Sequence, residues 1–385
     1  MYPQYNLKAL RQQTPALQSC VYLNTCAIGP WPNVTRQAVS RAADMLAEPN
    51  RMSREFWAIF SAARDTIARL INAGADEIAF MQNTAEGMNV IAHALPLQPG
   101  DNALMCDQEY PAVVYPFMNL ARLRGVEARI VPHDGGGLTL DLLERHADAR
   151  TRVVAVSTIE FVSGFRNDIV AIGEWCKARG IWLIVDGIQS LGAAPLDVKA
   201  AHIDALASGG HKWMLGPMGA GFLYVNRDRL DELAPPFAGA LSVVDAENYL
   251  DYNLTFQPDA RRFELGVPNA VGVAGLSASL GLLLSLDIGA IEAWTLHLSG
   301  LLLEQLERLG YRPFVARDSP HRSAIVSFNT PDPAGVAEAS QRLTAANVIH
   351  TIRGGNVRLG IHGFNTEDDI QTAVDALGSA VRRAK

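Results

Sequence analysis

Two ionisable residues, Asp186 and Lys212, lie in one stretch of small and apolar residues between positions 181 and 225. Asp186 follows the apolar run 181–185, which predicts a buried strand with a carboxylate at its end. Lys212 follows a small-residue turn at 208–210, where desolvation would lower the pKa of the amine and make it nucleophilic. Taken singly, a capping or ion-paired aspartate and a solvated loop lysine are the plainer interpretations.

A third feature is the segment Asn83-Thr84-Ala85-Glu86, at a predicted junction between a strand and a helix. The free N–H groups of a helix N-terminus can bind phosphate, although a plain capping motif has the same residues. An anion site, a strand-end carboxylate and a loop lysine together suit pyridoxal 5′-phosphate (PLP), which needs partners for its phosphate, ring nitrogen and aldehyde. A dinucleotide-binding enzyme is the alternative, but no G-x-G-x-x-G follows the first strand and no G-x-x-x-x-G-K-[ST] occurs.

The composition argues against several other classes of function. The net charge of −7 and the pI near 5.7 disfavour binding to nucleic acid or to an anionic membrane. The nine histidines form no HExxH motif, so we expect no metal, and the four cysteines form no CxxC pair, as in a reduced cytoplasmic protein. The N-terminal residues do not resemble a signal peptide, and the uncharged stretch 265–286 is expected to be a buried helix.

Short apolar runs alternate with amphipathic helical patterns up to about residue 225, which predicts a mostly parallel sheet covered on both faces. Ligands bind beyond the carboxyl ends of such strands, where Asp186 is expected. After about residue 260, two helical segments (270–286 and 289–309) precede a smaller α/β pattern. We therefore expect an N-terminal arm (1–30), a large cofactor-binding domain (31–265) and a C-terminal small domain (266–385), which the arm could join.

The sequence VDGIQSLGAAPLDV…GGHKWMLGPMGAGFLYV resembles the class V aminotransferase family of fold-type I PLP enzymes. Within this family it is most similar to the branch of cysteine desulfurases and isopenicillin N epimerase-like proteins. Further matching motifs are YLNTCAIGP, NTAEGMN, EYP at 109–111, RRFELGVPN at 261–269 and VRLGIHGFNTEDDI at 357–370. The resemblance implies a large domain with a mostly parallel seven-stranded sheet, a small α/β domain and a homodimer with PLP at the subunit interface.

The resemblance also implies a role for each matching residue. Lys212 would form the Schiff base with PLP and later move the proton at the α-carbon of the substrate. Asp186 would pair with the pyridinium nitrogen, and Gln189 would hydrogen-bond the phenolic oxygen. Tyr110 would lie over the ring, and Arg358 would pair with the α-carboxylate of the substrate.

The phosphate and the substrate would have further partners. Thr84 and the N–H groups of Ala85 and Glu86 would hold the phosphate, with help from Ser208 or Gly209 and from His211. Asn24 and Ala27, in the N-terminal arm, are further candidates for contact with the substrate.

The sequence departs from the desulfurase pattern at several positions. The loop 347–355 contains no cysteine where desulfurases carry a nucleophilic one, and Ala85, Phe161 and Val267 replace other family residues. On this basis we predict that the chain is not a persulfide-forming cysteine desulfurase. We expect an enzyme acting at the α-carbon of an amino acid through a Schiff base and a carbanion, as a C–S lyase by β-elimination or as an epimerase. An aminotransferase, an enzyme forming C–C or C–X bonds, and a non-catalytic binding module stay as alternatives.

Overall fold

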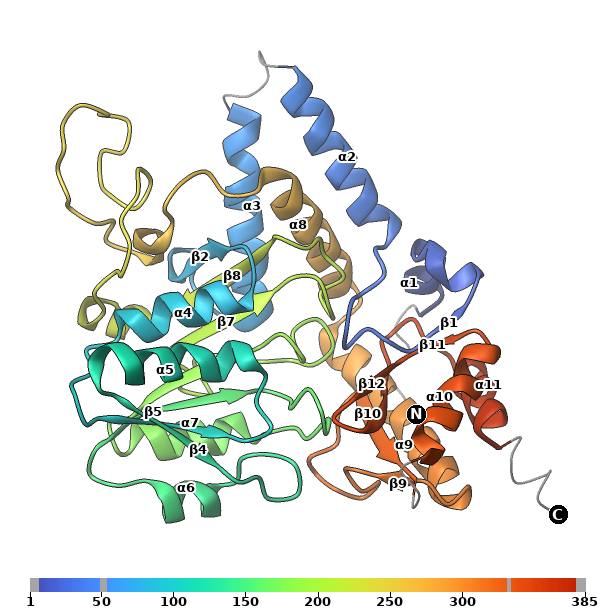
Figure 1. Ribbon diagram of the computed structural model, residues 1–385. Helices are drawn as coiled ribbons and strands as arrows, with labels where there is room; N and C mark the ends of the chain where they lie inside the picture. Colours follow the sequence, from blue (N-terminus) through green and yellow to red (C-terminus); the bar gives the residue numbers. More distant parts are fainter. Residues whose placement is uncertain (1–6, 49–53, 331–333, 379–385) are drawn as a thin grey trace.

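The computed structural model describes residues 7–48, 54–330 and 334–378, and the chain is arranged around two sheets (Figure 1). The large sheet has seven strands in the order β2-β8-β7-β6-β5-β3-β4, and only β8 runs antiparallel to its neighbours. Its strands are β2 (Ile78–Met81), β3 (Asn102–Cys106), β4 (Glu127–Val131), β5 (Thr151–Ser157), β6 (Trp182–Asp186), β7 (Ala205–Gly209) and β8 (Gly221–Val225). The expected mostly parallel seven-stranded sheet is confirmed.

Both faces of the large sheet are covered by helices, because successive side chains of a strand point to opposite sides. In β6, Trp182 and Ile184 pack into one apolar cluster, and Leu183 and Val185 pack into the other. The first cluster contains residues of α4 (Thr84–Ala94) and α5 (Pro111–Arg124). The second contains residues of α3 (Arg54–Ile71), α6 (Leu140–His146), α7 (Ile169–Lys177) and α8 (Ala270–Ser285).

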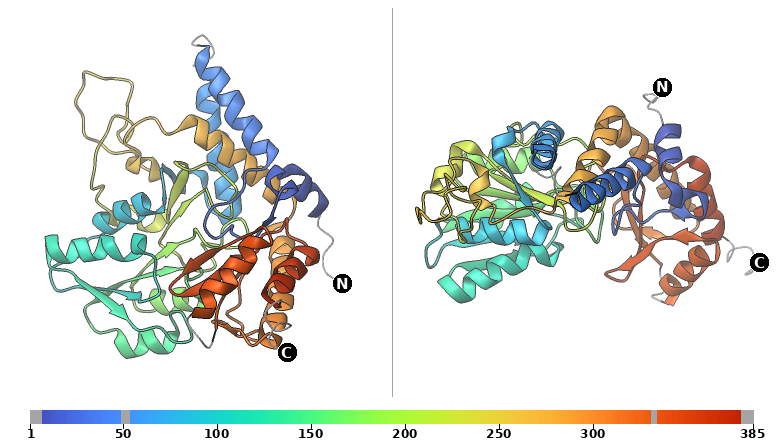
Figure 2. Two further views of the ribbon diagram at one scale, coloured as in Figure 1. Left: turned by 45° about the vertical axis from the view of Figure 1, so that its right-hand side comes forward. Right: turned by 90° about the horizontal axis from the view of Figure 1, so that it is seen from above.

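The small sheet is antiparallel, with the strand order β12-β13-β10-β9. Its strands are β9 (Arg312–Pro313), β10 (Ile325–Asn329), β12 (Thr351–Arg353) and β13 (Asn356–Gly360). The helices α9 (Ile288–Arg308), α10 (Ala334–Ala345) and α11 (Glu367–Gly378) contribute to its apolar core. This unit lies beside the large sheet and is coloured orange to red in Figures 1 and 2.

Helix α8 lies with the large sheet, although its residues fall inside the predicted 266–385 domain. It packs against α2 (Asn33–Ala47) and α3, and its buried leucines belong to the large-sheet core. Within the described ranges no single helix is long and apolar enough to cross a membrane, and α8 and α9, which together have such a length and composition, are bent by 78° at their junction. The boundary between the two cores therefore lies near the start of α9.

The N-terminal arm packs on the small unit. It comprises α1 (Leu7–Gln13), the 3-10 turn η1 (Pro15–Gln18) and β1 (Val21–Tyr22), and its residues 1–6 lie outside the described ranges. β1 pairs in parallel with β11 (Val348–Ile349), and Arg11 forms an ion pair of 2.8 Å with Asp369. In the part of the chain that the structure describes, the other 3-10 turns are η3 (Ala75–Glu77), η4 (Arg227–Glu232) and η5 (Ala260–Phe263).

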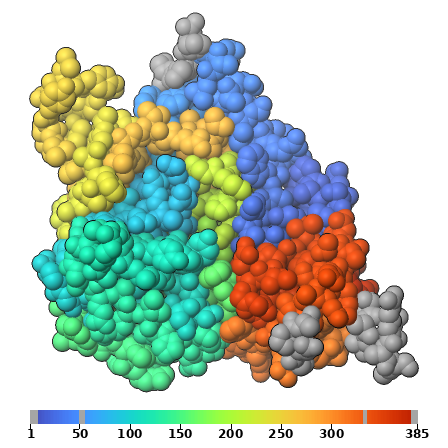
Figure 3. Space-filling model, in the orientation of Figure 1, coloured from blue at the N-terminus to red at the C-terminus, as the bar shows by residue number. Residues whose placement is uncertain are grey.

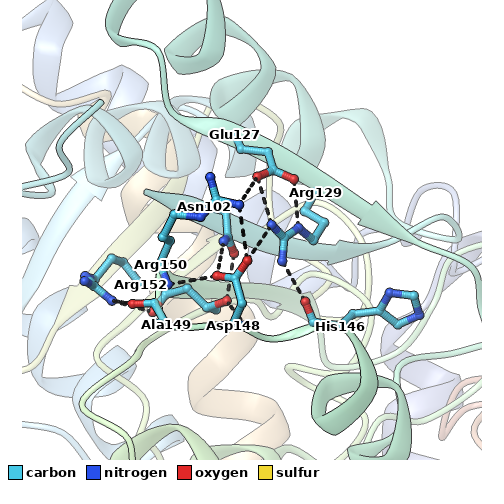
Figure 4. A network of polar contacts seen from close by, with 9 residues as sticks. Asn102, Glu127, Arg129, His146, Asp148, Ala149, Arg150 and Arg152 are labelled. Carbon is cyan, nitrogen blue, oxygen red and sulfur yellow. Dashed lines mark hydrogen bonds and ion pairs between the residues drawn. The ribbon is translucent and has the colours of Figure 1, made fainter. Parts of the chain in front are cut away.

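A polar network closes the amino ends of β3, β4 and β5 (Figure 4). Arg129 donates to both oxygens of Glu127 at 2.8 Å and to Asp148 at 3.0 Å, and Asn102 donates to Asp148 at 2.9 Å. The opposite, carboxyl edge of the sheet holds the other polar cluster, which contains most of the candidate site residues.

Candidate active site

The candidate residues from the large domain meet at the carboxyl ends of its parallel strands. Asp186 is the last residue of β6, Ser208 lies in β7, and Lys212 follows β7 on the adjoining loop. This edge is where an open parallel sheet binds its ligands. The structure therefore brings Asp186, Ser208 and Lys212 together at this edge, as the sequence predicts.

Lys212 is partly buried, and its amine has no fixed partner. Its Nζ lies 5.7 Å from the centre of the Tyr110 ring and forms no hydrogen bond or ion pair with another described residue. Burial lowers its pKa to about 8, although the carboxylate of Asp186 acts in the opposite direction. A minor fraction of this amine, about a tenth at pH 7, is therefore neutral, as a nucleophile or a base requires.

Asp186 is 1% exposed, and its Oδ1 accepts a hydrogen bond of 2.9 Å from the N–H of Ile188. Burial raises its pKa to about 6, against the opposing effects of that N–H and of Lys212. A buried carboxylate of this kind is stabilised by a cation, and a protonated pyridine nitrogen is such a cation.

Gln189 holds two other parts of the site in place. Its Oε1 accepts from Trp213 Nε1 at 3.0 Å, and its Nε2 donates to the carbonyl of Cys26 at 3.2 Å. One amide hydrogen is left for a ligand oxygen. Gln189 therefore joins the lysine loop to the N-terminal arm and keeps a donor for the predicted phenolic oxygen.

The start of α4 forms the predicted phosphate cradle. Thr84 Oγ1 accepts from the N–H of Gly209 at 2.9 Å, which brings the end of β7 to the helix and leaves the hydroxyl hydrogen free to donate. The N–H of Glu86 donates instead to the N-cap side chain of Asn83 at 2.9 Å. The role predicted for Glu86 therefore competes with helix capping, whereas Thr84 is placed to bind an anion.

The remaining predicted phosphate residues border this cradle. Ser208 is fully buried in β7, Ala85 lies in the first turn of α4, and His211 precedes Lys212. Burial and the neighbouring Lys212 charge lower the pKa of His211. His211 is therefore favoured as a neutral imidazole, which can donate one hydrogen bond to an anion.

Arg358 enters from β13 of the small sheet and is 2% exposed. Its Nη1 donates to the carbonyl of Phe161 at 2.6 Å, while its buried Nε has no hydrogen-bond partner. In the arm, the buried Oδ1 of Asn24 also has no partner. Because buried polar atoms are normally paired, these two mark a place for a polar ligand.

The N-terminal arm reaches the lysine loop directly. The N–H of Gly29 donates to the carbonyl of His211 at 2.8 Å. The N–H of Ala27 donates to the carbonyl of Asn24 at 2.9 Å and closes a turn within the arm. Tyr110, 48% exposed, meets the edge of Phe161 with ring centres 5.1 Å apart. The arm, the lysine loop and the Tyr110 segment thus enclose one site.

Several residues near the site were missed by the sequence reasoning. Cys26 is 1% exposed beside Arg358 and Lys212, and burial raises the pKa of its thiol. The buried acids Glu109 and Glu160 directly precede Tyr110 and Phe161. Only the YLNTCAIGP and EYP motifs, which contain Cys26 and Glu109, could have drawn attention to them.

Two residues without an assigned role lie in structural contacts. Arg166 pairs with Glu292 at 2.6 Å, whereas Asp168, the partner considered from the sequence, caps α7. His350 Nε2 lies 2.7 Å from Ser340 Oγ. Val267 is 60% exposed. It lines a cavity of about 640 Å³, and Glu86 lines the same cavity.

The donors present match PLP in both chemistry and location. An unpaired amine, a buried strand-end carboxylate and a helix N-terminus with a free hydroxyl donor lie at one edge of the sheet. Lys212 would hold the aldehyde carbon, Asp186 the ring nitrogen and Thr84 the phosphate. The fold and the site define a fold-type I PLP-dependent enzyme.

Comparison with known proteins gives the family. The model of the family described as aminotransferase class-V matches residues 33–372. Cysteine desulfurase CsdA of Escherichia coli K12 is 32% identical, over 99% of this chain and 98% of CsdA, and the cysteine desulfurase of Pectobacterium atrosepticum is 32% identical over 84% and 83%. The chain belongs to the class-V aminotransferase family, and its cofactor is PLP.

Solved structures agree with this assignment. The crystal structure of E. coli CsdA covers 99% of each chain with a TM-score of 0.87 at 27% identity. A C-DES variant with glycine covalently linked to its PLP cofactor has a TM-score of 0.87, over 96% of this chain and 98% of C-DES. At 24% identity, this second likeness concerns the fold alone.

The prediction that the chain is not a persulfide-forming cysteine desulfurase is wrong, and the preference for β-elimination or epimerisation falls with it. That prediction rested on one loop, residues 347–355, which contains no cysteine. The similarity to proteins named cysteine desulfurases extends over nearly all of both chains. One loop position therefore has less weight than the likeness of the whole site and fold.

Proposed function

We propose that this protein is a PLP-dependent cysteine desulfurase, which transfers the sulfur atom of cysteine to an acceptor thiol as a persulfide and leaves alanine. The observation that supports it most is the position of Arg358, whose buried Nε has no partner and which lies near Lys212. A guanidinium beside a reactive amine suits a substrate that is an α-amino acid. The choice of cysteine as substrate is supported by the names of the full-length relatives.

The residues of this chain have distinct tasks in that reaction. Bound PLP would supply an electron sink for the electron pair released at the α-carbon. Arg358 binds the substrate carboxylate and so orients the Cα–H bond. Lys212, whose pKa of about 8 leaves part of it neutral at pH 7, takes that proton and returns one. Asp186 and Gln189 hold the ring in position.

The assay is incubation of the PLP-loaded protein with L-cysteine and dithiothreitol, with alanine and sulfide measured together. We expect one alanine for each sulfide, since the carbon skeleton keeps its amino group. Lys212→Ala should remove both turnover and the visible absorbance of lysine-bound cofactor. Sulfide accompanied by pyruvate, or turnover without sulfide, would refute the proposal.

We further propose that the active form is a homodimer with the site at the subunit interface. The segment at 249–254 protrudes from the molecule, as the yellow region of Figure 3 shows. It exposes large apolar side chains, with Tyr249 76%, Leu250 85%, Tyr252 92% and Leu254 66% exposed. Apolar groups gathered in this way mark an association surface.

Light scattering during gel filtration measures the mass directly. We expect twice the chain mass of 41.6 kDa for the natural sequence. The double substitution Leu250→Asp and Tyr252→Asp should shift the protein toward one chain mass. A natural chain that stays monomeric at micromolar concentration with full turnover would contradict the dimer.

A further inference from the structure

Two buried glutamates, Glu109 and Glu160, lie close together near the candidate cofactor site. Glu109 follows β3 and is 7% exposed, and Glu160 follows β5 and is fully buried. Each carboxyl perturbs the pKa of the other, and a side-chain hydrogen bond between the two is among the causes. Two ionised carboxylates cannot form such a bond, because neither carries a hydrogen.

The other hydrogen bonds of the pair show where a proton belongs. Glu109 accepts from Ser157 N at 2.6 Å and from Ser157 Oγ at 2.5 Å, so its oxygens are supplied with donors. Glu160 Oε1 accepts from Asn167 Nδ2 at 2.9 Å, but its Oε2 is buried with no donor from another residue. A proton on Glu160 Oε2, donated to Glu109, satisfies every one of these oxygens.

The electrostatic surroundings favour retention of that proton. Burial is the largest cause that raises the pKa of each carboxyl, and the negative charge of Asp186 adds to it in both. For Glu160, the charge of Glu109 and the hydrogen bond with it raise the pKa further, whereas the hydrogen bonds from Ser157 and with Glu160 act to lower that of Glu109. Cys106, at the end of β3, is a further titratable group close to both acids, and its thiol is neutral because burial raises its pKa. No described basic side chain forms an ion pair with Glu109 or Glu160 within 4 Å.

Each glutamate is the immediate neighbour of a residue that faces the site. Tyr110 follows Glu109, and Phe161 follows Glu160. The two rings touch edge to face, and the Phe161 carbonyl accepts the Arg358 hydrogen bond of 2.6 Å. The segment that carries the ring-face residue and the segment that holds the substrate arginine are thus joined through the two acids.

We propose that Glu109 and Glu160 share one proton and are positioning residues, which hold Tyr110 and the Phe161 carbonyl in the places that PLP and the substrate-binding Arg358 require. The part that concerns Arg358 rests on the proposed function; the shared proton does not. Loss of the proton would leave two buried carboxylates in contact, which would force the segments apart.

The first experiment measures the shared proton in the protein without cofactor. Both folded-state pKa values are raised above those of the unfolded chain, so the stability that the proton supplies is complete below about pH 4.5 and is lost as the pH rises through the folded-state values. The urea midpoint of the natural chain should therefore fall between pH 5 and 8, below the range in which Lys212 raises the stability. Glu160→Gln should flatten this fall, because the amide donates to Glu109 at every pH, whereas Glu77→Gln, at a buried glutamate before β2, should not.

The second experiment measures positioning, with glycine as the ligand and the visible absorbance of bound PLP as the signal. Glu160→Ala should weaken glycine binding at least tenfold while the lysine-bound cofactor band persists. Glu160→Gln should bind glycine as the natural chain does at pH 7 and should keep that affinity at pH 9, where the natural chain loses it.

The outcomes separate this inference from the desulfurase proposal. A pH profile of Glu160→Gln that matches the natural chain would overturn the shared proton. Unchanged glycine binding by Glu160→Ala would overturn the positioning role. Failure to release sulfide from cysteine, with both glutamate results as expected, would refute only the choice of substrate and reaction.

Discussion

The contact between the N-terminal arm and the lysine loop can be tested by adding one methyl group at Gly29. The Cβ of an alanine there would lie 2.1 Å from the carbonyl oxygen of Lys212 and 2.8 Å from Leu215 Cδ2. Backbone at that distance cannot be accommodated without movement, and forced packing of this kind costs about 1–3 kcal/mol. For a chain of this size that corresponds to a loss of roughly 1–4 °C in Tm.

The displaced atoms belong to the residue that binds the cofactor, so Gly29→Ala should weaken PLP binding as well as stability. Thermal unfolding gives the first quantity, and titration with PLP, followed by visible absorbance, gives the second. Gly281→Ala is the matched control, because it lies in α8 with nothing within 4 Å of the new methyl group and should gain about 0.5–1 kcal/mol. If Gly29→Ala kept both the Tm and the PLP affinity of the natural chain, the close contact with Lys212 would be refuted.

Three further predictions concern the two ends of the site and its pH dependence. Arg358→Lys should raise the KM for cysteine by roughly 10- to 100-fold with a smaller change in kcat, because an ammonium lacks the paired, planar N–H donors that a guanidinium offers a carboxylate; steady-state kinetics would show an unchanged KM if this is wrong. Asn83→Ala should cost about 1 kcal/mol in urea unfolding and weaken PLP binding, since it removes the cap that orders the start of α4; equal PLP affinity would contradict the cradle. In the cofactor-free protein, Asp186 and Lys212 together should make stability fall from about pH 4 to 6, where only the folded state keeps the Asp186 proton, and rise from about pH 8 to 10.5, where only the unfolded state keeps the Lys212 proton. The double variant Asp186→Asn and Lys212→Met should lose both the fall and the rise of stability with pH that these two residues cause. A pH profile of stability identical to that of the natural chain would refute the pKa shifts of Asp186 and Lys212.

The positions of Asp186, Lys212 and the start of α4 could be predicted because each has a local signal, whereas Gln189 and Tyr110 were named only from the family resemblance. A carboxylate ends a short apolar run at Asp186, as strand periodicity indicates, and a small-residue turn precedes Lys212. Asn83 and Thr84 show the residue types of a helix start. The parallel sheet then brings these signals together, since the carboxyl ends of its strands lie at one edge.

Other features depend on packing between distant segments, which periodicity does not reveal. The contact of Glu109 with Glu160 exists only because both acids surround the end of β5. Arg166 forms an ion pair with Glu292, from α9, and not with its neighbour in the sequence, Asp168. The wrong prediction that the chain is not a persulfide-forming desulfurase had a different origin. It rested on the absence of a cysteine from a single loop.

The pairing of β1 with β11 determines when the site can be completed during synthesis. Val21 pairs with Val348, and the amide of Asn365 donates to the carbonyl of Tyr22 at 3.0 Å, so the arm has no sheet partner until residues 348–349 have left the ribosome. The large sheet ends at Val225 and can assemble earlier, with Lys212 already on its loop. Nascent chains should therefore meet PLP with the arm still undocked, and tight retention of the cofactor is among the last properties that the newly made protein acquires.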